Sequence, residues 1–151
     1  MPDSPEIGFY HLQKWPLEQA LPRLLEQALA RGLRAVVRVG SEARLESLNA
    51  ALWTYRQESF LPHGGPADGQ AAAQPVYLTP GDDVPNEATL LVLCDGVAAA
   101  DVDAFDRCAD MFDGHEAAVA AARSRWQALK DQGYPLTYWQ QTDDGKWRAK
   151  D

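Results

Sequence analysis

The sequence predicts an α/β fold with a largely parallel central sheet, built as a single domain over residues 1–151. Short apolar runs rich in β-branched and aromatic residues alternate with longer segments whose leucines recur every three or four residues. The most apolar run, 88–94, lacks polar alternation, which is typical of a strand covered on both faces. Strands that alternate with helices in this way usually form a parallel sheet with helices on its faces.

The first half of the chain is predicted to contain two strand–helix units. We expect a strand over 7–12, followed by a helix that begins near Pro16 and ends near Gly32. Proline suits the first turn of a helix because its missing N–H has no intrahelical partner there, and glycine favours the end. A second strand over 35–39 leads through Ser41, a candidate N-cap, into a second helix. The buried face of that helix is expected at Leu45, Leu48 and Leu52.

The second half is predicted to contain two further strands, over 75–79 and 107–112, besides the central apolar run. A flexible loop is expected over 64–74, where the residues are small and polar. A last helix should run from 115 to 132 and end at a glycine. Its inward stripe is predicted at Val119, Ala122, Trp126 and Leu129. The polar tail, 140–151, is expected to fray.

The charge balance restricts the class of partner. The chain has 22 acidic and 14 basic residues and a formal net charge of -8, which opposes direct nucleic-acid binding as the main activity. A local basic patch could still bind an acidic ligand. The seven acids between 95 and 116 are interpreted as a solvated acidic surface. No signal peptide or membrane-length apolar stretch is evident, so we expect a cytoplasmic protein without membrane contact, with Cys94 and Cys108 as reduced core thiols.

Residue patterns that carry chemistry are absent from the sequence. The three histidines match no metal-ligand spacing, and no nucleophile elbow is present. The Gly40–Ser41 turn follows a strand and opens a helix, but it lacks the glycine-rich motif and the lysine of phosphate-binding loops. We therefore expect no cofactor, no metal and no enzymatic activity of the isolated chain. The alternative is a small nucleotide-binding or metabolic enzyme of similar fold.

An aromatic connecting stretch is the first of two places suited to protein binding. Residues 52–63 contain Trp53, Phe60, Pro62 and His63, although loops are usually polar because their backbone faces water. Either these side chains fold back into the core, or they form an apolar patch that docks another protein. The residues alone leave both alternatives open.

The last predicted helix is the second such place. No acid lies between Val119 and Lys130, whereas Arg123, Arg125 and Lys130 are basic. Helical spacing puts Arg123, Gln127 and Lys130 on one face. A slot for an acidic peptide with a terminal aromatic residue could form there; its candidate residues are Arg123, Trp126, Gln127, Lys130 and Tyr134. The alternative is a solvated basic face, with Trp126 wholly in the core.

Several motifs give the chain a family resemblance. These are Phe9-Tyr10 in the first strand, Leu-Trp-x(5)-Ser-Phe-Leu-Pro-His over 52–63, and Ala-Arg-x-Arg-Trp over 122–126 with Gly133-Tyr134. Together they resemble the DNA polymerase III chi subunit, a small accessory protein of the bacterial clamp-loader assembly. The resemblance implies a Rossmann-like three-layer sandwich without a nucleotide site. It also implies a non-enzymatic bridge between the psi subunit and the acidic, phenylalanine-ended tail of the single-stranded-DNA-binding protein, with DNA contacted only indirectly.

The resemblance also assigns roles to individual residues. Trp53, Phe60 and Pro62, with the adjoining His63, match the psi side of the family. Arg123 matches the arginine that binds the tail carboxylate, and Trp126 stands where the family has an aromatic residue, often tyrosine. Gln127 stands where a lysine is expected, which removes one positive charge. Lys130, one turn further on, could replace that charge in part.

Overall fold

The structure, a computed structural model, describes residues 5–13, 15–54, 63–65, 74–144 and 146–150. Its α-helices are α1 (Leu17–Ala30), α2 (Glu42–Thr54) and α3 (Glu116–Asp131), and a short 3-10 helix spans Val102–Ala104. Its strands are β1 (Glu6–Leu12), β2 (Ala35–Arg38), β3 (His63–Gly64), β4 (Val76–Thr79), β5 (Leu90–Cys94), β6 (Arg107–Asp113), β7 (Leu136–Gln141) and β8 (Trp147–Lys150). The predicted α/β fold is confirmed.

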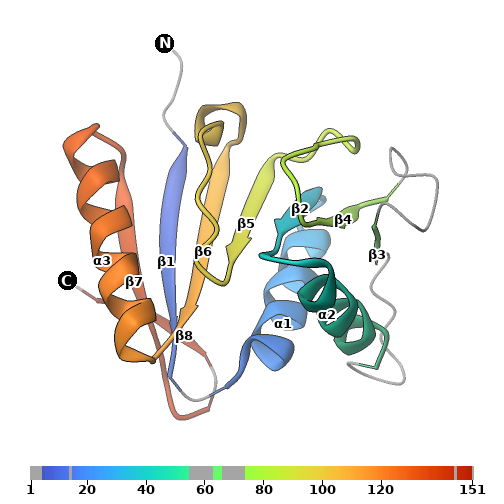
Figure 1. The fold of residues 1–151 in the computed structure, drawn as a ribbon, viewed down its shortest axis with the longest axis horizontal. Coiled ribbons are helices and arrows are strands. Elements are labelled where there is room, and N and C mark those ends of the chain that lie inside the picture. The colour runs from blue at the N-terminus through green and yellow to red at the C-terminus, as the bar shows by residue number, and fades with distance from the viewer. Residues whose placement is uncertain (1–4, 14, 55–62, 66–73, 145, 151) are drawn as a thin grey trace.

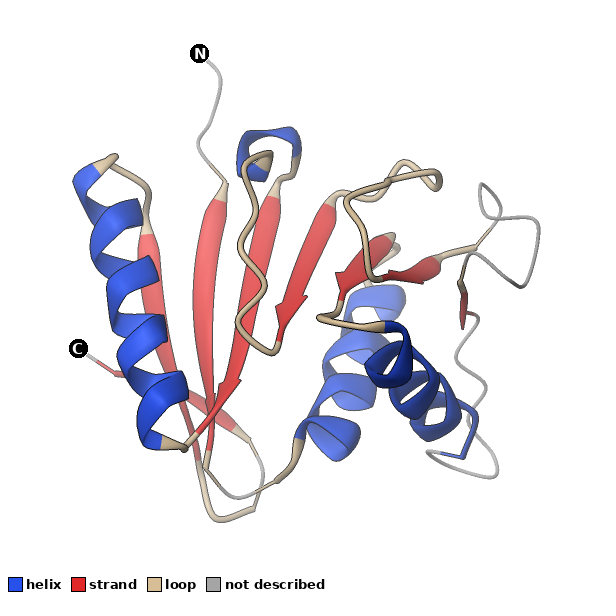
Figure 2. Cartoon of the chain, in the orientation of Figure 1, coloured by secondary structure: helices blue, strands red, loops and turns tan. Residues whose placement is uncertain are grey.

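All described strands join one sheet in the order β3-β4-β2-β5-β6-β1-β7-β8. Every pairing is parallel except that of β8 with β7. The side chains of the sheet alternate between two apolar clusters, one with α1 and α2 and the other with α3. Helices therefore lie on both faces of a largely parallel sheet, which confirms the three-layer sandwich (Figures 1 and 2).

The helices begin and end where the sequence predicts. The Oγ of Ser41 accepts the backbone N–H of Arg44 at 3.1 Å and so caps α2. Gly32 and Gly133 have φ angles of +76° and +90° just beyond α1 and α3, a conformation that favours glycine. Leu48 and Leu52 are buried against the sheet as expected.

The centre of the sheet is apolar on both sides. Every residue of β5 is buried, as the uninterrupted hydrophobic run of 88–94 predicts. Cys94 and Cys108 are free and buried. Burial raises the pKa of the Cys108 thiol to about 12 and that of Cys94 further still, so both remain protonated at neutral pH. Their expected character as core thiols is confirmed.

The tail 140–151, which was expected to fray, contains the end of β7 and strand β8. Residues 147–150 pair with β7, and the ring of Trp147 packs edge-on against Tyr10 with centroids 5.1 Å apart. This aromatic contact anchors an otherwise polar strand. In the predicted loop 64–74, Gly64 belongs to β3 and Gly65 is buried beside Leu45. Residues 66–73 of that loop lie outside the described residues.

The acidic segment is only partly a solvated surface. Asp110 of β6 is buried and accepts two hydrogen bonds from Arg125, at 2.6 and 2.9 Å. The carboxylate of Asp101 binds the buried guanidinium of Arg38 in the same bidentate way. The interpretation as a solvated surface is therefore wrong for Asp110, because an arginine distant in the sequence offsets the cost of removing its charge from water.

No helix of the described residues is suited to crossing a membrane. None of the helices in the described part of the chain combines the length and apolar character that spanning a bilayer requires.

The Asp110–Arg125 pair generates a prediction about stability. Replacing Arg125 with Met should lower the free energy of unfolding by about 3 kcal/mol, because it leaves a buried carboxylate unpaired. Burial already raises the pKa of Asp110. Without Arg125 the folded-state pKa should rise further, so the folded state gains a proton more readily than the unfolded state. The deficit relative to wild type should therefore shrink as the pH falls.

Urea denaturation at neutral pH and below about pH 5 measures both effects. The matched control is Arg123→Met, two residues away on the same helix but exposed, which should change stability by no more than about 0.5 kcal/mol. Equal losses for the two variants, or a deficit that is independent of pH, would contradict the role assigned to the buried pair.

Candidate functional site on the outer face of helix α3

Helix α3 packs against β6 and β7 through a narrow stripe. Ala122 is buried, while Val119, Trp126 and Leu129 are half-buried in the same apolar cluster. The indole of Trp126 meets the ring of Phe9 edge-on, with centroids 5.3 Å apart. Trp126 is therefore only partly buried, and it borders the solvent-facing side of the helix, as the sequence analysis expected of a site residue.

The outward face of α3 carries the predicted polar residues. Arg123, Gln127 and Lys130 are all exposed, in agreement with their helical spacing. Neither Arg123 nor Lys130 forms an ion pair with a residue in the described ranges. The structure thus brings two uncompensated positive charges together on the surface of a chain whose formal net charge is -8.

Arg125 does not belong to this face. Its guanidinium binds the buried carboxylate of Asp110, so its charge is neutralised within the fold. The basic character that the sequence assigned to three residues is therefore carried by two, Arg123 and Lys130. Successive helical residues are rotated by about 100°, so the two-residue offset between Arg123 and Arg125 already indicated different faces.

An acid borders the site and was missed by the sequence analysis. Gln127 donates a hydrogen bond from Nε2 to Oδ1 of Asp131, at 2.9 Å. Asp131 lies one residue beyond the acid-free segment 119–130, at the i+4 position where side chains on a helix meet. Its negative charge opposes the binding of an anion at Lys130. Its carboxylate also occupies the side-chain amide of Gln127, the residue that stands where a lysine is expected.

Tyr134 is held beside the helix end. Its hydroxyl donates to Oδ1 of Asp103 at 2.7 Å, and this hydrogen bond raises the pKa of Tyr134. The half-buried ring packs in the same apolar cluster as Trp126 and Leu129. Trp126 and Tyr134 thus belong to one apolar cluster, and both are only partly buried.

Tyr138, which packs in the same apolar cluster as Trp126, and its hydrogen-bond partner His11 were also missed. Burial raises the pKa of Tyr138 on β7, and the positive charge of Arg123 opposes that rise. The Tyr138 hydroxyl is hydrogen-bonded to Nδ1 of His11 on β1. Burial lowers the pKa of His11, so its imidazole is neutral at neutral pH. Strand pairing of β1 with β7 could have indicated this neighbourhood.

The second predicted surface lies near the other edge of the sheet. Trp53 is in the last turn of α2, and His63 opens the edge strand β3, where it pairs with Val76. Phe60 and Pro62 lie outside the described residues. The strand order separates β3 from β7 by almost the full width of the sheet, so the two predicted surfaces are far apart.

Neither a metal-binding cluster nor a phosphate-binding turn is evident among the described residues. None of their histidines, cysteines and acids gather in groups of three or more that could hold a metal ion. The Gly40–Ser41 turn lies beside carboxylates, because Arg44 of α2 binds both Glu18 and Asp95. Ser41 already satisfies one of the helix amides that an anion would need. This surrounding disfavours phosphate binding at the turn.

Comparison with known proteins identifies the family. The family model for the DNA polymerase III chi subunit, HolC, matches residues 5–137. The DNA polymerase III subunit chi of Pseudomonas aeruginosa (strain PAO1) is 34% identical over 118 residues, which cover 78% of this chain and 82% of that protein. The probable DNA polymerase III subunit chi of Rickettsia prowazekii is 34% identical over 88 residues, 58% of this chain. The match spans about half of the Rickettsia protein, 53% of its length.

The family model covers nearly every described element, from β1 to the start of β7. The motifs over 52–63 and 122–126 fall within the matched region. The chain therefore belongs to the DNA polymerase III chi subunit family.

Proposed function

We propose that the protein is a non-catalytic adaptor of the replicative polymerase that joins the psi subunit of the clamp loader to the single-stranded-DNA-binding protein. Family membership supports a replication accessory role. The observation that carries the finer proposal is the exposed cationic face of α3, with Arg123 and Lys130 beside the half-buried Trp126. This protein would act in the cytoplasm, where the replication machinery assembles.

The α3 face suits an acidic peptide that ends in an aromatic residue. The guanidinium of Arg123 can bind a terminal carboxylate in a bidentate way, through two parallel hydrogen bonds. Trp126 and Tyr134 offer apolar surface for the terminal ring, and Lys130 attracts acids further up the tail. A single arginine–carboxylate contact with one buried ring supports micromolar affinity after the entropy of association is subtracted. Asp131 reduces this affinity further, since it lies among the cationic residues.

The psi side of the proposal rests on the motif over 52–63. Aromatic residues are the usual anchors of protein interfaces, and Trp53, Phe60, Pro62 and His63 match the family in that stretch. An interface at the β3 edge would leave the α3 face free, because the two lie at opposite sides of the sheet. One chain could then hold both partners at once.

Loss of Arg123 is the direct test of the tail site. Arg123→Ala should weaken binding of a labelled acidic tail peptide at least tenfold, because charge-assisted hydrogen bonds contribute about 1.5–3 kcal/mol. Fluorescence anisotropy measures this change, and added salt should weaken binding of the wild-type protein through screening.

Two controls accompany this measurement. Arg31→Ala removes an exposed arginine at the end of α1, on the other face of the sheet, and should leave the affinity within about twofold, as distant surface charges are screened. A peptide without its terminal phenylalanine should bind as poorly to wild type as the intact peptide binds to Arg123→Ala. If all these combinations bind equally, the site is not on α3.

The acid at the margin of the site yields a second prediction. Asp131→Asn should tighten tail binding by about two- to threefold, because it removes a like charge without changing side-chain size. Gln127→Lys should act in the same direction by restoring the expected cation. The same anisotropy assay measures both, with Asp144→Asn as a control for an acid exposed elsewhere. Unchanged affinity for both variants would show that tail binding does not use this part of α3.

The psi patch is tested by Phe60→Ala. If Phe60 is an interface anchor, this variant should weaken the complex with psi about thirtyfold, equivalent to about 2 kcal/mol, with little change in melting temperature. Calorimetry of the complex and thermal melting of the free chain measure the two quantities. A variant that melts well below wild type would instead assign Phe60 to the core. Arg123→Ala serves as the matched control, and its affinity for psi should equal that of wild type.

A further inference from the structure

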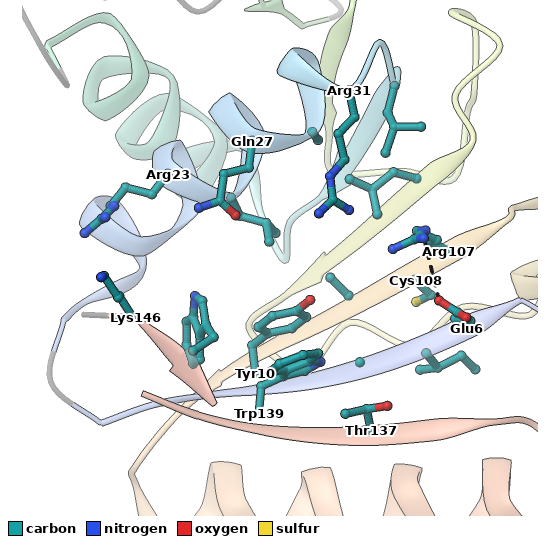
Figure 3. A pocket seen from close by; sticks show the side chains of 18 residues that line it. Glu6, Tyr10, Arg23, Gln27, Arg31, Arg107, Cys108, Thr137, Trp139 and Lys146 are labelled. Carbon is teal, nitrogen blue, oxygen red and sulfur yellow. Dashed lines mark ion pairs between the residues drawn. The ribbon is translucent and has the colours of Figure 1, made fainter. Parts of the chain in front are cut away.

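A groove of about 550 Å³ lies on the sheet face opposite α3. One wall is α1, and the floor is formed by β1 and β7, with the β8 end of the sheet beside it (Figure 3). In the described part of the chain no helix packs over β1 and β7 on this face; the rings of Tyr10, Trp139 and Trp147 cover them instead. The groove is distinct from the tail site, because the sheet separates the two.

Gly8 shapes the floor of the groove. A Cβ at this position would lie 2.8 Å from the ring of Tyr10 and 3.0 Å from the indole nitrogen of Trp139. Because Gly8 has no Cβ, both rings can pack flat against the strand at this position. The rings of Tyr10 and Trp139 stack at a centroid distance of 5.9 Å and an interplanar angle of 11°. The ring of Trp147 packs edge-on against Tyr10. The result is a preformed aromatic surface that is only partly buried.

The rims of the groove are basic. Arg23, Gln27 and Arg31 recur every four residues along α1, so they form a row about 12 Å long. Arg107 of β6 and Lys146 before β8 add cations from the sheet side, where Lys146 pairs with the exposed Asp144 at 3.9 Å. As Figure 3 shows, Arg23 and Lys146 lie at one end, and Arg31 and Arg107 at the other. The lining has one acid, Glu6, which pairs with Arg107 at 3.8 Å.

We propose that this groove binds a short stretch of single-stranded nucleic acid. Proteins that bind single strands combine cations along the sugar–phosphate backbone with aromatic rings on which the bases stack. The four cations would contact phosphates from the rims, and the exposed parts of Trp139 and Trp147 would meet the bases. A duplex hides its base faces within the stack and so cannot use the aromatic floor.

The aromatic floor favours nucleic acid over an acidic peptide as the occupant. Carboxylate side chains would satisfy the four cations but not the rings, and an acidic tail with one terminal phenylalanine would supply only a single ring for them. Bases are planar and present a stacking face whatever their sequence. The amide of Gln27, midway along the row, can donate to and accept from base edges or phosphates. The charges and the rings together therefore select a ligand that is both anionic and aromatic at short intervals.

The net charge of -8 limits the strength of this binding. Long-range repulsion lowers the affinity for any polyanion, so the free chain should bind weakly and only at low salt. About three neutralised phosphates would give a slope near -2 in a plot of log K against log salt for a single strand. Such a site becomes useful when other contacts already hold the protein near the strand, because tethering raises the effective concentration to the millimolar range.

The test is fluorescence anisotropy of the full chain with a labelled oligothymidylate of about ten nucleotides at low salt. Wild type should bind with the salt dependence given above, and Arg31→Glu should weaken binding at least tenfold and lower the slope by about 0.7. Arg123→Glu is the matched control: it changes the charge equally on an exposed helical residue of the opposite face. It should bind the oligonucleotide at least fivefold more tightly than Arg31→Glu does.

The aromatic contribution is tested with Trp139→Ala, which should also lose at least tenfold in affinity, with thermal melting to confirm folding. If that variant does not fold, Gln27→Glu tests the groove by charge instead, since it puts a negative charge at an exposed position midway along the row, and it should also weaken binding. Equal effects of Arg31→Glu and Arg123→Glu, equal binding of duplex, or binding of an acidic peptide in place of the oligonucleotide would each overturn the proposal. Tail-peptide binding by Arg31→Glu reports on the α3 site separately, so the two proposals can fail independently.

Discussion

The orientation of α3 about its own axis decides which of its residues face solvent. The helix is rich in alanine and buries little apolar area; Ala122 is its fully buried residue in the structure. Two specific contacts therefore set its orientation: the bidentate pair of Arg125 with buried Asp110, and the edge-on packing of Trp126 against Phe9. With these fixed, Arg123 and Lys130 must face solvent. A buried ion pair adds little net stability, but it disfavours every rotation that leaves Asp110 unpaired.

The two faces of the sheet are covered unequally around β1. On one face α3 lies over β1 and its neighbours, and the rings of Phe9, Phe112 and Trp126 fill the space between. On the other face α1 packs toward the centre of the sheet, and β1 and β7 are covered by side chains alone. Alternation along β1 puts Phe9 in one layer and Tyr10 in the other. The same strand thus supports the proposed tail-binding surface on one side and an aromatic groove on the other.

Much of this fold could be predicted from local patterns, because β5, the Ser41 cap and the glycine ends of α1 and α3 depend on nearby residues. The features that local patterns did not indicate depend on distant partners. Strand β8 is polar and short, and it is held by pairing with β7 and by the contact of Trp147 with Tyr10, near the other end of the chain. The burial of Asp110 requires an arginine fifteen residues away. Within the candidate site, helical spacing puts Arg123, Gln127 and Lys130 on one face, as the structure has them. Asp131 lies one residue beyond the acid-free segment, and Tyr138 belongs to β7, a strand that no local pattern predicted.

Placing cationic residues on opposite faces has a consequence for an acidic protein. Any anionic ligand that approaches from a distance meets the field of a chain with net charge -8, which suppresses unspecific association with nucleic acid and acidic proteins. Only at contact, within about a Debye length of 8–10 Å, do Arg123 and Lys130, or Arg23 and Arg31, dominate the local potential. Binding at either face is then weak for the free chain and becomes substantial when another contact has already brought the ligand close. An adaptor that must stay attached to a large assembly yet release its ligands repeatedly is well served by such contacts, because weak sites dissociate fast while their combination persists.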